Sequence, residues 1–202
     1  AEVFDMAKNK MVDFGVDAPT VTLDFRRVQK RKDKIVNQLH NGVNALIKKG
    51  EIDVFEGVGR MLGPSIFSPM PGTISVEMNN GAENEMLVLK NLIIATGSRP
   101  RTLPGLDIDE TQVLSSDGAL SMETLPQSIL IVGGGVIGIE WASMLNDFGV
   151  DVTVLEYADR ILPTEDEDLS KEMKKLLTKK GITFAVNAKV LSETLMKTDR
   201  SV

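Results

Sequence analysis

The sequence predicts an α/β protein made of two incomplete three-layer domains, the first of which carries a small antiparallel meander. Three observations lead to this fold class: an apolar run that breaks into glycines within residues 129–140, alternating strand and helix patterns over residues 128–186, and short β-type runs over residues 52–97. Strands that alternate with helices are typical of parallel sheets with right-handed crossovers. We place the first domain at residues 1–98 and the second at 99–202, with residues 99–127 as a connecting segment.

The composition of the 202 residues limits the chemistry that the chain can carry out. It has no Cys and a single His, His40, so disulfides, thiolate nucleophiles and metal sites built on Cys or His are not expected. The formal net charge of -6 argues against a nucleic-acid partner. The sequence contains neither a signal-peptide pattern nor an apolar run long enough to span a membrane. We therefore expect a cytoplasmic protein with small-molecule or protein partners.

The first domain is predicted to begin with a long amphipathic helix over residues 23–49, because apolar residues recur there at spacings of seven, four, four and three. Short strands are then expected at 52–55, 58–62, 73–78 and 87–89, with a turn at 79–81 and a proline-rich surface loop at 63–72. Residues 92–95 are predicted to form a buried strand that runs into the turn of Thr96, Gly97 and Ser98.

The second domain is predicted to read strand, helix, strand, helix, strand. The strands are expected at 128–132, 152–155 and 182–186, and the first of them is apolar enough to be buried on both faces. A helix is expected over 136–148, and Thr164 is expected to start another with a capping-box pattern. We therefore expect a parallel sheet with its crossover helices.

The glycines between the first strand and its helix form a Gly-x-Gly-x-x-Gly pattern at Gly133, Gly135 and Gly138. In this pattern the first glycine permits a tight turn, the second lets a pyrophosphate approach the backbone, and the third lets helix and strand pack closely. Glu156 ends the next strand 21 positions after Gly135, as expected for the carboxylate that binds the adenosine ribose. Because Glu156 would repel a 2′-phosphate and only Arg160 could offer it a cation, the pattern favours NAD over NADP.

These stretches, together with residues 96–98 and 116–120, make the chain similar to the flavoprotein pyridine-nucleotide:disulfide oxidoreductases, and within them to the bacterial dihydrolipoamide dehydrogenase branch. The resemblance implies a homodimer that oxidises dihydrolipoyl groups, carried on an acyltransferase domain of a 2-oxo acid dehydrogenase complex such as the branched-chain one. Electrons would pass from a redox disulfide through FAD to NAD. By the same resemblance the cofactor-binding residues are Gly133, Gly134, Gly135, Val136, Ile137, Gly138, Glu140, Glu156 and Val190 for NAD, and Gly59, Thr96, Gly97 and Ser98 for FAD.

Glu140 is open to two interpretations. Its spacing alone fits a solvated helix residue, although its neighbours Ile139 and Trp141 are apolar. The resemblance instead implies a position near the nicotinamide and the lysine that contacts the flavin in the family.

The chain also departs from the family pattern. The family's first glycine motif for FAD, its Cys pair and its catalytic His-Glu pair are absent. We therefore expect the middle of such an enzyme, without catalytic residues, inactive by itself and holding FAD weakly if at all. Mercuric reductases, transhydrogenases and NADH oxidases share the motifs that are present, so they stay alternatives. A non-catalytic nucleotide-binding module is a further alternative.

Overall fold

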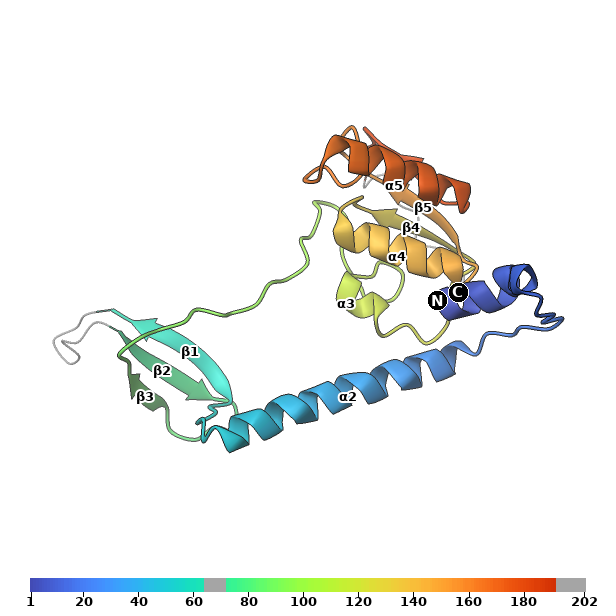
Figure 1. Cartoon of the computed structure of the whole chain (residues 1–202). Coiled ribbons are helices and arrows are strands. Elements are labelled where there is room, and N and C mark those ends of the chain that lie inside the picture. The colour runs from blue at the N-terminus through green and yellow to red at the C-terminus, as the bar shows by residue number, and fades with distance from the viewer. Residues whose placement is uncertain (64–71, 192–202) are drawn as a thin grey trace. The chain divides into compact units, whose positions relative to one another are not determined.

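The computed structural model describes residues 1–63 and 72–191, and the chain divides into two compact units. One unit comprises residues 33–99, and the other combines residues 1–32 with the chain from Pro100 onward (Figure 1). The division at Arg99 and Pro100 adjoins the domain boundary expected from the sequence, but the first 32 residues cluster with the second unit. The assignment of each domain to a cofactor stays a prediction.

The unit of residues 33–99 contains the meander. Its strands β1 (Gly57–Leu62), β2 (Thr73–Met78) and β3 (Glu85–Val88) pair antiparallel in the order β1-β2-β3. Gly81 adopts a φ of +74° in the turn between β2 and β3, a conformation that glycine adopts without steric cost. The predicted antiparallel meander is confirmed, while most of the predicted loop at 63–72 lies outside the described residues.

Two strands expected in this half of the chain are wrong. Residues 52–55 and 92–95 form no strand, and Ile93 is 89% exposed although it was expected to be buried. A strand needs a neighbour that pairs with its N–H and C=O groups. Neither segment has such a neighbour among the described residues, so the apolar pattern alone does not produce a strand there.

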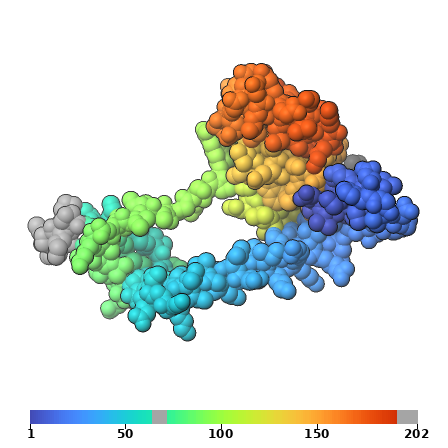
Figure 2. Space-filling model, in the orientation of Figure 1, coloured from blue at the N-terminus to red at the C-terminus, as the bar shows by residue number. Residues whose placement is uncertain are grey.

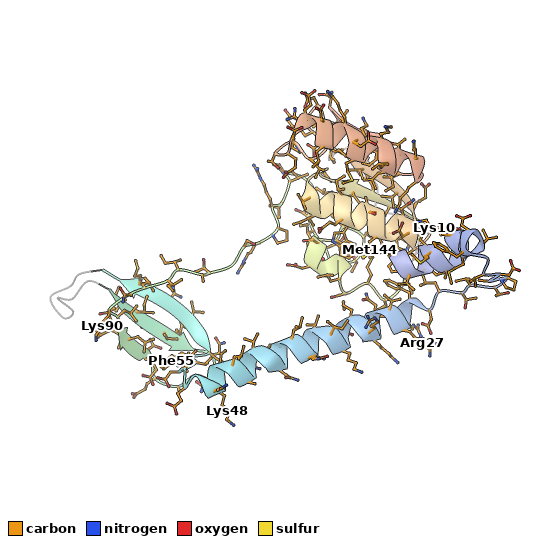
Figure 3. The ribbon with its side chains drawn as sticks, in the orientation of Figure 1. Lys10, Arg27, Lys48, Phe55, Lys90 and Met144 are labelled. Atoms are coloured by element: carbon orange, nitrogen blue, oxygen red, sulfur yellow. The ribbon has the colours of Figure 1, made fainter. Side chains whose placement is uncertain are left out.

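The predicted long helix is confirmed as α2 (Phe25–Lys49), which ends at Gly50. None of its residues is buried, and Figure 3 shows its side chains projecting on all sides between Arg27 and Lys48. Its first turns, up to Lys32, belong to the unit that also contains the chain from Pro100 onward, and they contact neighbours in that unit. The rings of Phe25 and Phe148 pack edge to face, with 5.8 Å between their centroids. The side-chain amide of Gln29 donates to the carbonyl oxygens of Leu120 and Met122.

The second unit, formed by residues 1–32 and the chain from Pro100 onward, contains the predicted parallel sheet. Strands β4 (Ser128–Val132), β5 (Asp151–Leu155) and β6 (Thr183–Ala185) pair in that order, with Ser128 opposite Asp151 and Thr153 opposite Thr183. The helices α4 (Val136–Asp147) and α5 (Glu167–Lys179) connect the strands and are drawn beside the sheet in Figure 1. The strand and helix order expected from the sequence is confirmed.

The core of this unit lies between the sheet and its helices. Its buried apolar residues are Ile139, Ala142, Leu145, Val150, Val152, Val154, Ile161, Leu162, Leu177 and Ile182. Ile129 and Ile131 pack against this core, whereas Leu130 on the opposite face of β4 is 54% exposed. The expectation that β4 is buried on both faces is therefore wrong. That second face opens into a cavity lined by Leu130, Val132 and the connecting segment.

The start of α5 also differs from the sequence expectation. The helix begins at Glu167, and its N-cap is Asp166, whose carboxylate accepts a hydrogen bond from the backbone N–H of Asp168. Residues 162–165 form a turn instead, because Leu162 has a φ of +48° and its carbonyl accepts from the N–H of Glu165. Thr164 therefore precedes the helix and does not cap it.

The first residues form short helical segments that the sequence patterns did not predict: α1 (Glu2–Asp5), a π-helical turn (Met6–Lys10) and a 3₁₀ turn (Met11–Phe14). Helix α1 contacts α4, and Figure 2 shows the atoms of this N-terminal stretch against the body that holds α4. The hydrogen bond from Lys10, followed by that from Asn9, lowers the pKa of Asp5. A last short helix, α3 (Ser116–Ala119), lies in the connecting segment.

No helix within the described residues is long and apolar enough to cross a membrane. The same part of the chain contains no cluster of three or more His, Cys, Asp or Glu side chains that could hold a metal ion.

We expect Leu145→Ala to lower the free energy of unfolding by about 3 kcal/mol, because it removes a fully buried side chain from the core. The matched variant Leu130→Ala alters the exposed face of β4 and should cost less than about 1 kcal/mol. Urea unfolding followed by circular dichroism measures both. Equal losses would contradict the assignment of the core to one face of β4.

Candidate dinucleotide site

The site begins where β4 ends. Gly133 has a φ of +112°, a conformation that side-chain-bearing residues rarely adopt. Its backbone N–H donates to the carbonyl of Leu155 at 2.8 Å, which carries the β4–β5 ladder into the turn. The glycine at this position is therefore explained by backbone conformation, as the motif predicts for the first of its three glycines.

Gly134 is held through both of its backbone polar groups. Its N–H donates to the Glu156 carboxylate at 2.6 Å, and its carbonyl accepts from the N–H of Leu162 at 2.7 Å. A Cβ at this position would lie 3.1 Å from Ile161 and 3.2 Å from Glu156, closer than ordinary packing allows. The resemblance assigned Gly134 to NAD, but sequence reasoning missed its packing role, because the glycine pattern treats this position as variable. The only signal was that three glycines are consecutive.

Gly138 and Gly135 are glycines for different reasons. A Cβ at Gly138, in the first turn of α4, would collide with the carbonyl oxygen of Gly133, so packing of helix against turn requires glycine. Gly135 is the N-cap of α4 with an ordinary φ of -74°, and a Cβ there would meet nothing within 4 Å. Neither conformation nor packing explains this glycine. The open space beside Gly135 leaves room for a ligand, and its assignment to the pyrophosphate stays a prediction.

The N-terminus of α4 is suited to bind an anion. No side chain caps it, and the first N–H groups of a helix, with the positive end of its dipole, favour a phosphate. Val136 and Ile137 are exposed beside it. Residues of this turn also line a cavity of about 1460 Å³, which the connecting segment and Trp141 complete. The arrangement therefore offers both a phosphate cradle and apolar surface.

Glu156 lies directly after β5, and the backbone fixes its position. Its N–H donates to the carbonyl of Ala185 at 2.8 Å and its own carbonyl accepts from Ala188 at 3.0 Å. One carboxylate oxygen accepts from Gly134 and the other from the N–H of Ala158 at 2.7 Å. Each oxygen keeps a lone pair for a further donor, so the carboxylate is oriented and still able to accept from a ribose hydroxyl.

The remaining NAD predictions lie around this centre. Glu140 is exposed on α4, and Val190 is half-buried in the segment that follows β6. The terminal nitrogen of Arg160 donates to the carbonyl of Pro163 at 3.3 Å. Its Nε is buried without a partner in the described part of the chain. The assignment of Glu140 and Val190 to NAD stays a prediction.

The predicted FAD residues lie in the other unit. Gly59 is in β1 opposite Val76, and Thr96, Gly97 and Ser98 are exposed in the segment without regular structure that follows β3. Gly97 has a φ of +76°, which fits the predicted turn. These four assignments also stay predictions.

Comparison with known proteins places this geometry in context. Residues 5–198 match the family model described as pyridine nucleotide-disulphide oxidoreductase. The chain is 64% identical over all its 202 residues to dihydrolipoyl dehydrogenase of Bacillus subtilis, of which it spans 42%. It is 35% identical over 191 residues, 95% of its length, to the mitochondrial dihydrolipoyl dehydrogenase of Pisum sativum, of which it spans 36%.

Two solved structures have a similar fold. LpdA from Mycobacterium tuberculosis is similar with a TM-score of 0.80 and 22% identity, over 92% of this chain and 39% of that one, which shows likeness of fold alone. The HOCl-induced flavoprotein disulfide reductase RclA from Escherichia coli is 32% identical with a TM-score of 0.69, over 83% of this chain and 36% of that one.

Two glycine substitutions should separate packing from ligand access. We expect Gly138→Ala to lower the free energy of unfolding by about 2 kcal/mol or more, because the new methyl group collides with backbone. Gly135→Ala places its methyl group in open space at an ordinary φ and should change stability by no more than about 0.5 kcal/mol. Thermal unfolding monitored by circular dichroism compares them. Equal destabilisation would refute the distinction.

Proposed function

Because the chain belongs to the pyridine nucleotide-disulphide oxidoreductase family, we propose that it is part of an enzyme that oxidises dihydrolipoyl groups with NAD as acceptor. The observation that carries this proposal is the 64% identity to the dihydrolipoyl dehydrogenase of Bacillus subtilis over the whole chain. The chain spans less than half of that relative, so the activity belongs to a larger protein of which these residues supply the NAD site.

In this proposal the pyrophosphate of NAD binds at Gly135 and the N-terminus of α4. The open space at Gly135 and the uncapped helix support this placement. Glu156 accepts hydrogen bonds from the adenosine ribose, and its carboxylate is already held in place by Gly134 and Ala158. Val190 contacts the adenine, and Glu140 lies toward the nicotinamide. These residues bind and orient the cofactor, and none of them reacts.

The flavin half of the proposal rests on fewer observations. Gly59, Thr96, Gly97 and Ser98 would contact FAD, which supplies the two-electron relay between a dithiol and the nicotinamide. The positive φ of Gly97 and the exposure of the three-residue turn suit a backbone that approaches a ligand. No Cys is present among the 202 residues, so the dithiol chemistry belongs to other parts of the proposed enzyme.

The partners follow from the same proposal. The substrate is the dihydrolipoyl group on an acyltransferase domain, the enzyme is a homodimer, and its compartment is the cytoplasm. The similarity to a flavoprotein disulfide reductase of Escherichia coli keeps another reaction of the family as the second candidate. Both candidates use the nicotinamide-nucleotide site of this chain and differ in the substrate that exchanges electrons with the flavin.

We expect the chain to bind NADH saturably and NADPH about tenfold or more weakly, because the Glu156 carboxylate repels the added 2′-phosphate. Isothermal titration calorimetry with each nucleotide measures this difference. Gly135→Ala, which leaves the fold intact, should weaken NADH binding about tenfold by obstructing the pyrophosphate. Absence of NADH binding, or equal affinity for the two nucleotides, would contradict the proposed NAD site.

A further inference from the structure

We propose that Glu156 is a positioning residue for the phosphate-binding turn, in addition to binding the ribose. The inference rests on the proposed function, because it concerns how this chain binds NAD. Its basis is the hydrogen bond from the Gly134 N–H to the Glu156 carboxylate, 2.6 Å long. This bond joins the ribose-binding residue to the turn that holds the pyrophosphate.

The geometry makes Gly134 dependent on this bond. Gly134 is buried, and its N–H cannot turn to water. The following peptide group is fixed by the hydrogen bond from the Leu162 N–H to the Gly134 carbonyl at 2.7 Å. A buried N–H without a partner costs free energy comparable to a lost hydrogen bond. Removing the carboxylate therefore leaves the turn with an unpaired donor, and the turn must move to satisfy it.

Movement at Gly134 reaches the pyrophosphate site directly. Gly135 is the next residue and the N-cap of α4, and Gly133 on the other side is packed against Gly138. The orientation of the first N–H groups of α4 is thus set by a turn that Glu156 holds. Glu156 fixes the phosphate cradle before any nucleotide binds, and its carboxylate then presents its remaining lone pairs to the ribose.

A glutamine cannot replace Glu156 in this role. The two carboxylate oxygens accept from two separate N–H groups, those of Gly134 and Ala158. An amide has one acceptor oxygen and one donor nitrogen. Whichever way the amide of Glu156→Gln turns, one of the two backbone N–H groups faces another donor. Glu156→Asp keeps the charge, but its side chain is one methylene shorter and does not span the distance to Gly134.

The experiment pairs protein variants with a modified ligand. Calorimetry measures NADH and an NADH analogue whose adenosine ribose lacks both hydroxyl groups, each against the unaltered chain, Glu156→Gln and Glu156→Asp. The analogue cannot use the ribose contact. If Glu156 also positions the turn, both variants bind the analogue about fivefold to tenfold more weakly than the unaltered chain does. If Glu156 only binds the ribose, all three proteins bind the analogue equally, and the proposal is overturned.

Asp159→Asn is the matched control, because it removes one exposed negative charge three residues further along the same loop. It should leave the affinity for the analogue unchanged or slightly improve it. A loss as large as that in Glu156→Gln would assign the effect to charge and overturn the positioning role.

A ligand-free measurement keeps this test separate from the proposed function. The amide resonances of Gly134 and Gly135 in a ¹H–¹⁵N spectrum should shift in both Glu156 variants and stay in place in Asp159→Asn. Unmoved resonances would overturn the positioning role. If the unaltered chain binds neither NADH nor the analogue, the proposed function fails, and the amide resonances alone decide whether Glu156 holds the turn.

Discussion

The candidate site depends on the turn between β4 and α4, and that turn depends on the two backbone hydrogen bonds of Gly134. Its N–H is bound by Glu156 and its carbonyl by Leu162, so residues after β5 hold a turn that follows β4. With Gly134 held by these two bonds, Gly133 can keep its positive φ and α4 can pack closely at Gly138. The free N–H groups at the start of α4 then face open space at Gly135. These backbone groups, which the protein itself leaves unused, support the proposed phosphate site.

Much of the fold could be predicted from the sequence. Periodicity predicted the order of elements from β4 to β6 and the extent of α2, because those patterns are long or repeated. Periodicity failed for residues 92–95, because a strand needs a pairing partner that no local pattern reveals. It also failed for Leu130, because the exposure of that side chain depends on what covers one face of β4. The start of α5 was misplaced because the positive φ of Leu162 makes a turn where a capping pattern was read.

The candidate site likewise contains features that the sequence predicts and features that it does not. The conformational role of Gly133 and the packing role of Gly138 follow from spacing, since each concerns the turn or the helix that follows it. The role of Gly134 does not, because it depends on contacts with Glu156 and Ile161, more than twenty positions away in the chain. A further constraint is that the chain spans 42% of its Bacillus subtilis relative.

The most direct test of the central claim is a crystal structure of the chain with NAD bound. We predict that the pyrophosphate lies over Gly135, with its oxygens accepting from the first N–H groups of α4, and that the adenosine ribose hydroxyls donate to Glu156 while its bond to Gly134 is retained. A pyrophosphate bound elsewhere, or a Glu156 carboxylate that leaves Gly134 when the ribose binds, would contradict this account.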